Sequence, residues 1–368
     1  MTGFRKFLLN VHLWVGLTAC LLVFVLGTTG AVLTFEYQLD HLLNPSLFHV
    51  RPQAQRLPLA QLADAVKKQY PQGRLALLDL STSSPAPDLS YNFVLLEGKQ
   101  RRQVFVDQYT GRILGARDQA KSFVTLVHKL HVMLFGGAAM KMVTTWGSLL
   151  LCLLALTGIY LWWPRKIFGA NFKASGRRIN FDLHNSVGLY ASVFVVIFAF
   201  TAVVMHWEEQ FYPVANFLTR SADETPDPRL SSAPAAPGTP PASLDQLLAV
   251  AQAQMPGARV TQIGLPTKPT DIARVWLKFP EDGTPAGRTW VYLDQYSGKV
   301  LWARNARTAP LGTRYMKSWN RQIHTGDIFG WWSKIVAFLA SLSVGFLSIS
   351  GPLIWLLKQK KKTAAVVA

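Results

Sequence analysis

The chain of 368 residues has little cysteine and few acidic residues. It contains two cysteines, Cys20 and Cys152, and 20 Asp and Glu residues against 38 Lys and Arg. Both cysteines lie inside long apolar runs, so a disulfide framework and a CxxC redox pair are excluded. We interpret both as small buried hydrophobic residues.

The motifs of several enzyme classes are also missing. The sequence has no Walker A loop, no GxGxxG after a strand, no HExxH and no nucleophile elbow. There is therefore no recognisable site for a hydride donor. Electrons for a redox reaction would have to come from a partner, a quinone or a soluble reductant.

Four apolar runs dominate the remaining sequence. Residues 11–35, 142–163, 183–207 and 335–357 contain no Asp, Glu, Lys or Arg. Each is longer than the roughly 18 residues that mark a membrane-spanning helix. The first run is too long for a signal-peptide core and is not followed by a small-residue cleavage site, so we expect it to remain as an anchor.

Basic residues cluster at the ends of these runs. Arg5 and Lys6 precede the first run, five basic residues fill the loop at 165–178, and four lysines follow the last run at 358–362. By the positive-inside rule these ends and both termini are cytoplasmic, and the two long intervening segments lie outside. The formal charge of +18 thus indicates topology, and nucleic-acid binding is not expected because no basic patch with interleaved aromatic residues is present.

The two outer segments contain a repeated motif. Residues 104–114 (VFVDQYTGRIL) recur as 290–301 (WVYLDQYSGKVL). Each copy predicts two short strands around a glycine turn, in which Asp107 or Asp294 caps local N–H groups. Each copy also follows an amphipathic helix that ends before a proline, and further strands are predicted at 75–80, 91–96, 260–263 and 275–279. We therefore expect a small α+β module that is present twice.

The repeat continues into the membrane segments. Residues 130–136 resemble residues 323–330 at an offset of 193 residues between the two histidines. Gly158 and Gly351 are separated by the same 193 residues. The predicted fold is an α-helical membrane protein with four transmembrane helices in two parallel repeats and two periplasmic α+β domains. The predicted segments are a first helix at 1–36, a domain at 50–120, an interfacial segment and second helix at 121–165, a cytoplasmic loop at 166–181, a third helix at 182–208, a linker at 221–241, a second domain at 242–306, an interfacial segment and fourth helix at 315–358, and a cytoplasmic tail at 359–368.

Two V-D-x-Y-T/S-G turns in modules between His-bearing spans resemble the PepSY-associated transmembrane family. The second copy has Leu293 where the first has Val106. The resemblance covers nearly the full chain. It extends to bacterial inner-membrane ferric-siderophore reductases, and it implies a haem-b protein whose PepSY-like modules are periplasmic.

Four histidines occupy matching places in the two repeats. His12 and His184 lie at the cytoplasmic start of their spans, whereas His131 and His324 precede the second and fourth spans on the other side. A pseudo-twofold axis would bring each pair to opposite faces of one flat ring, and neutral imidazole is a common axial ligand of haem iron. We therefore predict two b-type haems, each with two histidine ligands.

Other residues near these positions are secondary candidates. Gly16 and Gly188 follow His12 and His184 by four residues on the same helical face, where an absent side chain leaves room for a ring. His206 reaches the outer level about 33 Å along its helix from His184 and is an alternative ligand, although its counterpart in the first repeat is Thr34.

The sequence predicts an electron conduit in the bacterial inner membrane that reduces a ferric siderophore and releases Fe(II) in the periplasm. The electron donor is a cytoplasmic reductant or a quinone. Two alternatives remain: a membrane-anchored PepSY protein that binds a partner without catalysis, in which the histidines hold helices together, and a protein that handles haem or metal without redox cycling.

Overall fold

The computed structural model describes residues 3–80, 86–222, 228–233 and 238–367. The chain separates into two compact units, and each is described by itself. The membrane unit comprises Met1–Glu36, Val127–Phe211 and Trp319–Ala368, and the sheet unit comprises Tyr37–Leu126 and Tyr212–Ser318.

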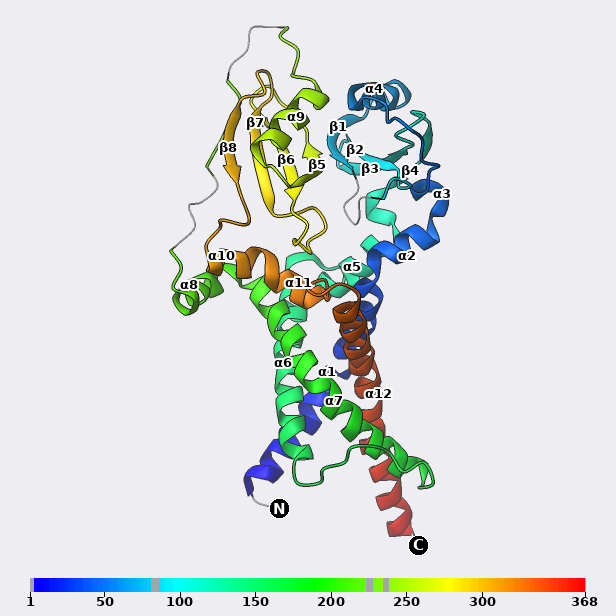
Figure 1. Cartoon of the computed structure of the whole chain (residues 1–368). Coiled ribbons are helices and arrows are strands. Elements are labelled where there is room, and N and C mark those ends of the chain that lie inside the picture. The colour runs from blue at the N-terminus through cyan, green and yellow to red at the C-terminus, as the bar shows by residue number, and fades with distance from the viewer. Residues whose placement is uncertain (1–2, 81–85, 223–227, 234–237, 368) are drawn as a thin grey trace. The chain divides into compact units, whose positions relative to one another are not determined.

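The membrane unit is built on four long apolar helices that run side by side (Figure 1). Each is long and apolar enough to cross a membrane, which confirms the four predicted spans. The four helices are α1 (Gly3–Thr34), α6 (Gly137–Trp162), α7 (Gly176–His206) and α12 (Trp331–Val367).

Small residues allow these helices to approach closely. A Cβ atom on Gly27 of α1 would lie 2.8 Å from the backbone nitrogen of Gly345 on α12 and 2.9 Å from the carbonyl oxygen of Ser341. Contacts of this kind are typical of membrane helices, where close backbone approach and van der Waals packing replace the hydrophobic effect.

Shorter helices precede or follow the four long ones. Two of them carry predicted site residues: α5 holds His131 and α11 holds His324. The shorter elements are α2 (Glu36–Leu43), α3 (Pro45–Phe48), α4 (Leu59–Gln69), the 3₁₀ turn η1 (Gln119–Lys121), α5 (Phe123–Met133), α8 (Glu208–Thr219), α9 (Leu244–Gln254), α10 (Leu311–Arg314), the π-helical turn η2 (Tyr315–Trp319) and α11 (Asn320–Thr325).

The sheet unit contains one antiparallel sheet of eight strands in the order β4-β3-β2-β1-β5-β6-β7-β8. Each half of the chain contributes a four-stranded meander, and the meanders join where β1 pairs with β5, with Leu78 opposite Ile263. The two predicted α+β regions therefore share one sheet. The strands are β1 (Arg74–Asp79), β2 (Tyr91–Glu97), β3 (Gln100–Val106), β4 (Ile113–Asp118), β5 (Arg259–Gly264), β6 (Ile272–Lys278), β7 (Thr289–Asp294) and β8 (Val300–Arg304).

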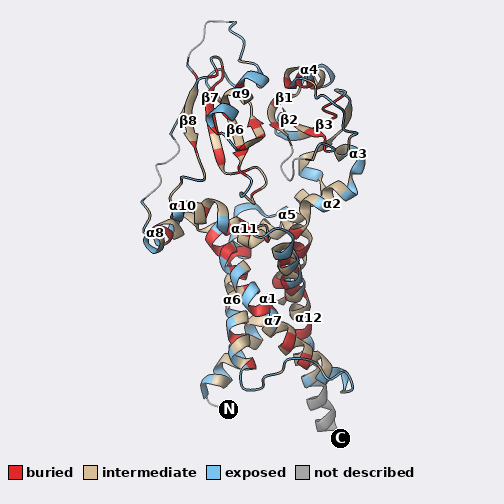
Figure 2. Ribbon diagram, viewed as in Figure 1, coloured by how far each residue is buried: buried red, intermediate tan, exposed pale blue. Residues whose placement is uncertain are grey.

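One face of this sheet packs against α4 and α9 and forms the main core, which appears red in Figure 2. Leu62 and Val66 of α4 and Leu247 of α9 are buried against alternate strand residues such as Phe93 and Val275. The two helices are also linked directly, because the Asp245 carboxylate accepts hydrogen bonds from the first backbone N–H groups of α4.

The two Asp-Gln-Tyr turns adopt the geometry that the sequence predicts. The Asp107 carboxylate accepts from the backbone N–H of Tyr109 at 2.9 Å, and Asp294 accepts from that of Tyr296 at 3.0 Å. The predicted capping role of both aspartates is thereby confirmed. Residues 223–227 and 234–237 of the predicted linker lie outside the described residues, but Ser232 between them is buried and accepts from the backbone N–H of Gln295.

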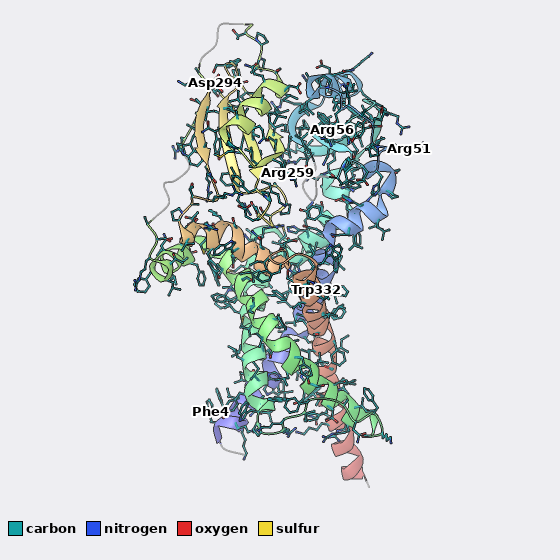
Figure 3. The ribbon with its side chains drawn as sticks, viewed as in Figure 1. Phe4, Arg51, Arg56, Arg259, Asp294 and Trp332 are labelled. Carbon is teal, nitrogen blue, oxygen red and sulfur yellow. The ribbon has the colours of Figure 1, made fainter. Side chains whose placement is uncertain are left out.

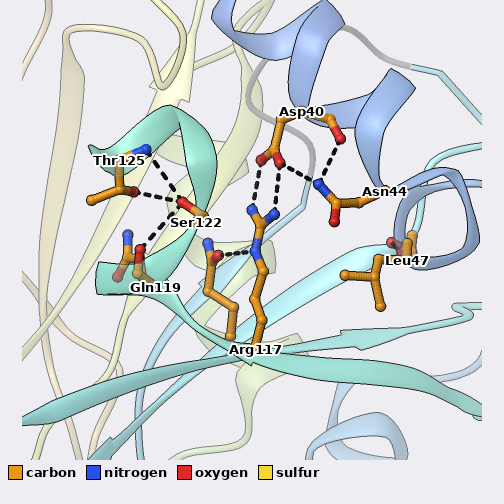
Figure 4. Close-up of polar contacts among 9 residues, drawn as sticks. Asp40, Asn44, Leu47, Arg117, Gln119, Ser122 and Thr125 are labelled. Atoms are coloured by element: carbon orange, nitrogen blue, oxygen red, sulfur yellow. Dashed lines mark hydrogen bonds and ion pairs between the residues drawn. The ribbon is translucent and has the colours of Figure 1, made fainter. Parts of the chain in front are cut away.

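The opposite face of the first half-sheet is covered by α2 and α3. Phe48 packs edge-on against Phe105 of β3 with 4.9 Å between ring centres. Arg117 of β4 donates two hydrogen bonds of 2.6 Å to the Asp40 carboxylate of α2 (Figure 4). Both side chains of this ion pair are only 16% exposed, so the pair fixes α2 on the sheet.

We expect the Asp40→Ala variant to lose about 3 kcal/mol of stability in the sheet unit, because Arg117 would remain buried without its counter-charge. Guanidinium titration of the detergent-purified protein, followed by tryptophan fluorescence, measures this loss. Asp64→Ala removes an exposed carboxylate near Lys67 and serves as control. Equal midpoints for the two variants would contradict the assignment.

Candidate functional site: two histidine pairs in the membrane unit

The structure brings His12 of α1 and His184 of α7 together. Their ring centres are 6.5 Å apart, and the ring planes are inclined by 86°. The Nδ1 atom of His12 is 2.9 Å from the hydroxyl oxygen of Thr157 on α6, and that of His184 is 2.8 Å from the hydroxyl oxygen of Ser350 on α12. All four long helices thus contribute to this inner pair.

His131 of α5 and His324 of α11 form a second pair with the same construction. Their ring centres are 6.4 Å apart at an angle of 50°. The Nδ1 atom of His131 lies 2.8 Å from the hydroxyl oxygen of Thr29 on α1, and that of His324 lies 3.1 Å from the hydroxyl oxygen of Thr201 on α7. We call this the outer pair.

The direction of these hydrogen bonds fixes the imidazole tautomers. The Thr157 and Thr201 hydroxyls donate to the carbonyl oxygens of Leu153 and Ile197 one turn earlier in their own helices, so their oxygens accept from the histidines. His324 Nδ1 also donates to the carbonyl oxygen of Phe198 at 2.9 Å, and a carbonyl can only accept. Nδ1 therefore carries the proton, and the lone pair of Nε2 is available to a metal.

The four hydroxyl residues were missed by the sequence analysis, although the repeat contains a signal for them. Thr29 and Thr201 are 172 residues apart, like His12 and His184, and Thr157 and Ser350 are 193 residues apart, like His131 and His324. Ser and Thr are common in membrane helices, where they bond to their own backbone. Only the shared offset distinguishes these four.

Glycines beside the imidazoles make room for the rings. A Cβ atom on Gly158 would lie 3.4 Å from Cε1 of His12, and one on Gly351 would lie at the same distance from Cε1 of His184. In the outer pair, a Cβ atom on Gly30 would lie 3.3 Å from Cε1 of His131. These glycines therefore leave the backbone of the neighbouring helix in contact with the rings of His12, His184 and His131.

Each pair lines a cavity. The inner cavity, of about 270 Å³, includes the predicted packing residues Gly16 and Gly188 in its wall, and the outer cavity is about 360 Å³. These volumes are close to the lower end of the range of about 300–1,000 Å³ for ligand pockets. Leu151, Val195 and Val344 line both cavities, so a single apolar layer separates them.

Basic side chains lie in the wall of each cavity. Arg5 and Arg165 line the inner one, and Lys141 and Arg321 line the outer one. The Nη1 atom of Arg321 is buried, lies 3.8 Å from the Asp327 carboxylate and makes no hydrogen bond among the described residues. An anionic group in the outer cavity would satisfy this donor.

His206 and His128 also line the outer cavity but belong to neither pair. The ring of His206 contacts that of Trp207, with 5.4 Å between ring centres, and within the described residues its buried Nδ1 atom has no hydrogen-bond partner. Burial and the neighbouring Arg321 guanidinium lower the pKa of His128. Within the part of the chain that the structure describes, neither ring has the hydroxyl partner that the four paired histidines share.

The outer pair is neutral at physiological pH. Burial lowers the pKa of His131 to about 3, with a further contribution from His324, and burial lowers the pKa of His324 to about 4. Neutral imidazole is the form that ligates a metal. Among the described residues, no group of three or more His, Cys, Asp or Glu side chains could hold a metal ion. A metal ion between the two histidines would therefore need additional ligands that do not come from these side chains.

The distance between the two ring centres of each pair suits an iron atom bound between the imidazoles and held by a ligand ring such as porphyrin. Two imidazoles bonded to opposite sides of one metal ion at about 2.0 Å have ring centres about 6.4 Å apart. The observed values are 6.5 and 6.4 Å. The apolar walls, the glycines and the basic residues match a flat apolar ring with carboxylate substituents, so the residues of both pairs fit haem.

Fold and site together define a membrane protein with four apolar spans and a separate α+β unit. The sequence model of the family described as PepSY-associated TM region matches residues 9–358. The chain therefore belongs to this family. No curated protein sequence matches it significantly.

If the outer pair binds haem as predicted, Thr29→Val should weaken its retention by about tenfold, because the partner that orients His131 is lost. The haem-to-protein ratio during dilution into apomyoglobin measures the release. Thr28→Val is the matched control, since the hydroxyl of Thr28 bonds to Phe24 of its own helix and to no histidine. Equal release from both variants would refute the orienting role of Thr29.

Proposed function

We propose that this chain is a haem-dependent oxidoreductase of the bacterial inner membrane that reduces ferric chelates. His12 and His184 would hold one b-type haem, and His131 and His324 would hold the other. The observation that carries the proposal is the construction shared by both pairs: imidazoles spaced for one iron, each with its Nδ1 atom hydrogen-bonded and its Nε2 atom available.

The proposed topology follows from charge and from the repeat. The basic residues at 5–6, 165–178 and 358–362 would keep both termini and the short loop in the cytoplasm. The sheet unit is then periplasmic, and the outer pair lies at the periplasmic level. The equal offsets of the histidines and of their hydroxyl partners support two parallel repeats, each comprising two spans and one α+β region.

Haem bound at both levels would supply one-electron redox chemistry across the bilayer. The chain contributes position and environment. Thr29, Thr157, Thr201 and Ser350 hold the imidazoles in the ligating tautomer. The shared layer of Leu151, Val195 and Val344 keeps water and ions from passing between the cavities, while it is only one side chain thick.

The cavity cations would receive the carboxylates of the bound group. Arg5 and Arg165 serve the inner level, and Lys141 and Arg321 serve the outer one. A cation near the iron also favours its reduced state, because the ferrous site carries one positive charge fewer. The basic walls therefore contribute to binding and to the reduction potential.

The proposed substrate is iron(III) in a chelate with hard oxygen donors, such as a siderophore. One electron converts Fe(III) to Fe(II), which such donors bind less tightly, and the iron is released. A quinol or a cytoplasmic reductant supplies the electron, and a quinol that gives two electrons reduces two chelates and loses two protons. No proton transfer by a side chain is required, which agrees with the lack of an acid–base motif in the sequence.

The purified protein should contain about two b-type haems per chain, as one haem binds at each pair. We expect His184→Ala to lose the inner haem, His324→Ala the outer one, and the double variant both. Pyridine haemochrome analysis gives the stoichiometry. His49→Ala, an exposed histidine of the sheet unit, should keep both haems. A wild-type protein without haem absorbance would contradict the proposal and favour the alternative of a membrane-anchored protein that binds a partner without catalysis.

Activity separates reduction from haem handling. In proteoliposomes loaded with a reductant, ferric chelate outside should yield Fe(II) that ferrozine traps, and His324→Ala should lower the initial rate at least about 100-fold because its redox group is lost. Trp332→Ala, on an exposed side chain of α12, should be unaffected. Haem that moves to apomyoglobin while no Fe(II) forms would indicate a haem-handling protein.

A further inference from the structure

One end of the membrane unit is strongly basic. It is the end at which α1 begins, the loop 163–175 joins α6 to α7, and α12 ends (Figure 1). Asp182 is the only acidic residue of the unit at this end, and it is buried in an ion pair of 2.8 Å with Arg178. The other acidic residues of the unit lie at the opposite end and are Glu36, Glu208, Glu209 and Asp327.

The exposed cations at this end include five without a carboxylate partner. We call them the basic loop surface; they are Lys6, Arg165, Lys166, Lys173 and Arg177. Within the part of the chain that the structure describes, none of the five forms an ion pair. The guanidinium carbon of Arg165 is 5.0 Å from the ring centre of Phe181, and Nζ of Lys166 is 5.5 Å from that of Trp163. Ring faces, and no carboxylates, therefore lie against these two cations.

The loop between α6 and α7 is held by contacts of its own. The indole Nε1 of Trp162 donates to the carbonyl oxygen of Ile167 at 2.7 Å. Phe168 packs edge-on against Trp162 with 5.1 Å between ring centres, and its carbonyl oxygen accepts from the hydroxyl of Tyr190 at 3.1 Å. The loop cations are therefore carried by a fixed backbone.

The first turn of α1 is fixed beside the end of α6. Phe4 (labelled in Figure 3) packs edge-on against Tyr160 with 5.8 Å between ring centres. Arg5 donates to the carbonyl oxygen of Leu161 at 2.9 Å. Lys6 follows directly and is exposed, so it is held at the same end of the bundle as the loop cations.

The helices at this end extend beyond their apolar runs. The runs begin at residue 11 in α1 and at residue 183 in α7, whereas the helices begin at Gly3 and Gly176. At about 1.5 Å per residue, the added segments are roughly 12 and 10 Å long. A lipid headgroup layer is roughly 5–8 Å thick on each side of the membrane. Arg177 and the loop before it therefore lie within reach of a soluble protein.

The same loop closes the inner cavity. Trp162, Arg165 and Phe181 line this cavity. On its other side, Trp162 contacts the exposed ring of Phe168. A redox protein bound to the basic loop surface would thus be separated from the cavity of the inner pair by this single layer of side chains.

We infer that the basic loop surface binds an acidic, soluble electron-transfer protein that supplies the electrons. Charge complementarity steers such partners and gives fast, salt-dependent association. Exposed Trp163, Phe168 and Phe172 supply the aromatic contacts that are enriched in protein interfaces. A quinol, which arrives through the membrane, would make no use of these cations. The electron transfer rests on the proposed function, whereas binding itself needs no haem.

A flavodoxin is one protein of this class. Its anionic flavin hydroquinone loses one electron and becomes the neutral semiquinone, and no proton is released. The electron converts Fe(III) at the inner pair to Fe(II). The step needs no acid or base from the chain.

The test uses the full chain in nanodiscs of neutral phosphatidylcholine. Flavodoxin is the acidic probe and cytochrome c is the basic probe, and surface plasmon resonance measures binding in about 20 mM salt. The wild type should bind flavodoxin at least about tenfold more tightly than cytochrome c, and about 200 mM salt should weaken this binding at least about tenfold.

Charge reversal locates the binding surface. The triple variant Lys166→Glu, Lys173→Glu, Arg177→Glu should bind flavodoxin at least about tenfold more weakly. Its matched control has the same net charge and reverses three exposed cations of the sheet unit: Lys68→Glu, Lys99→Glu, Arg101→Glu. The control should change the affinity less than about twofold. Lys173→Glu alone, on an exposed loop residue, should weaken binding about threefold and serves as the test if the triple variant fails to fold.

Stopped-flow reduction separates docking from the redox site. Flavodoxin hydroquinone should reduce the loop variant at least about tenfold more slowly than the wild type, whereas the small reductant dithionite should reduce both at rates within about twofold. Equal losses in the loop variant and its control would overturn the inference. So would wild-type protein that retains phosphatidylglycerol through these cations but binds no flavodoxin. Haem content is measured on the same samples. Flavodoxin binding without haem counts against the proposed function alone, and haem without flavodoxin binding counts against this surface alone.

Discussion

The membrane unit depends on the hydrogen bond between each buried imidazole and a hydroxyl group of a neighbouring helix. An imidazole in an apolar bundle must be neutral, and its N–H needs an acceptor. A Ser or Thr hydroxyl that already donates to its own helix has an oxygen free for this purpose, as Thr157 does for His12. One interaction thus supplies the acceptor, sets the tautomer and ties α6 to α1. The same interaction ties α12 to α7 through Ser350 and His184.

This constraint explains why a small residue lies beside each of two hydroxyl partners. A residue next to Thr157 or Ser350 lies against the ring that the hydroxyl orients. Gly158 and Gly351 occupy these two places, where an added Cβ atom would already touch the ring at 3.4 Å from Cε1. A side chain that extends beyond Cβ would displace the imidazole from its acceptor. The hydroxyl residue and the glycine therefore act together. The adjacent pairs Thr157-Gly158 in α6 and Ser350-Gly351 in α12 are 193 residues apart in the sequence.

Much of the fold could be predicted from the sequence, but less of the site could. Length and composition determine the four spans, and the Asp107 and Asp294 turns follow from local chemistry. The structure brings His12 to His184 and His131 to His324, as the repeat predicts. The hydroxyl partners were missed because Thr and Ser in apolar helices usually bond only to their own backbone. The pairing of β1 with β5 was missed because the sequence of an edge strand does not indicate which strand of another sheet it will pair with.

The two halves share the residues that face the predicted haems and differ in what surrounds them. Thr29 and Thr201 keep the same role, yet Thr34 corresponds to His206, and His128 corresponds to Arg321. The sheet also differs between the halves. Asp40 forms a buried ion pair with Arg117 of β4 in the first half, and Arg304 of β8 packs against the indole ring of Trp290 in the second. A cofactor with two equivalent faces needs equivalent ligands from both halves, but a substrate needs only one surface. The equal sequence offsets are therefore kept at the imidazoles and their hydroxyl partners, whereas the residues around them and in the two half-sheets differ.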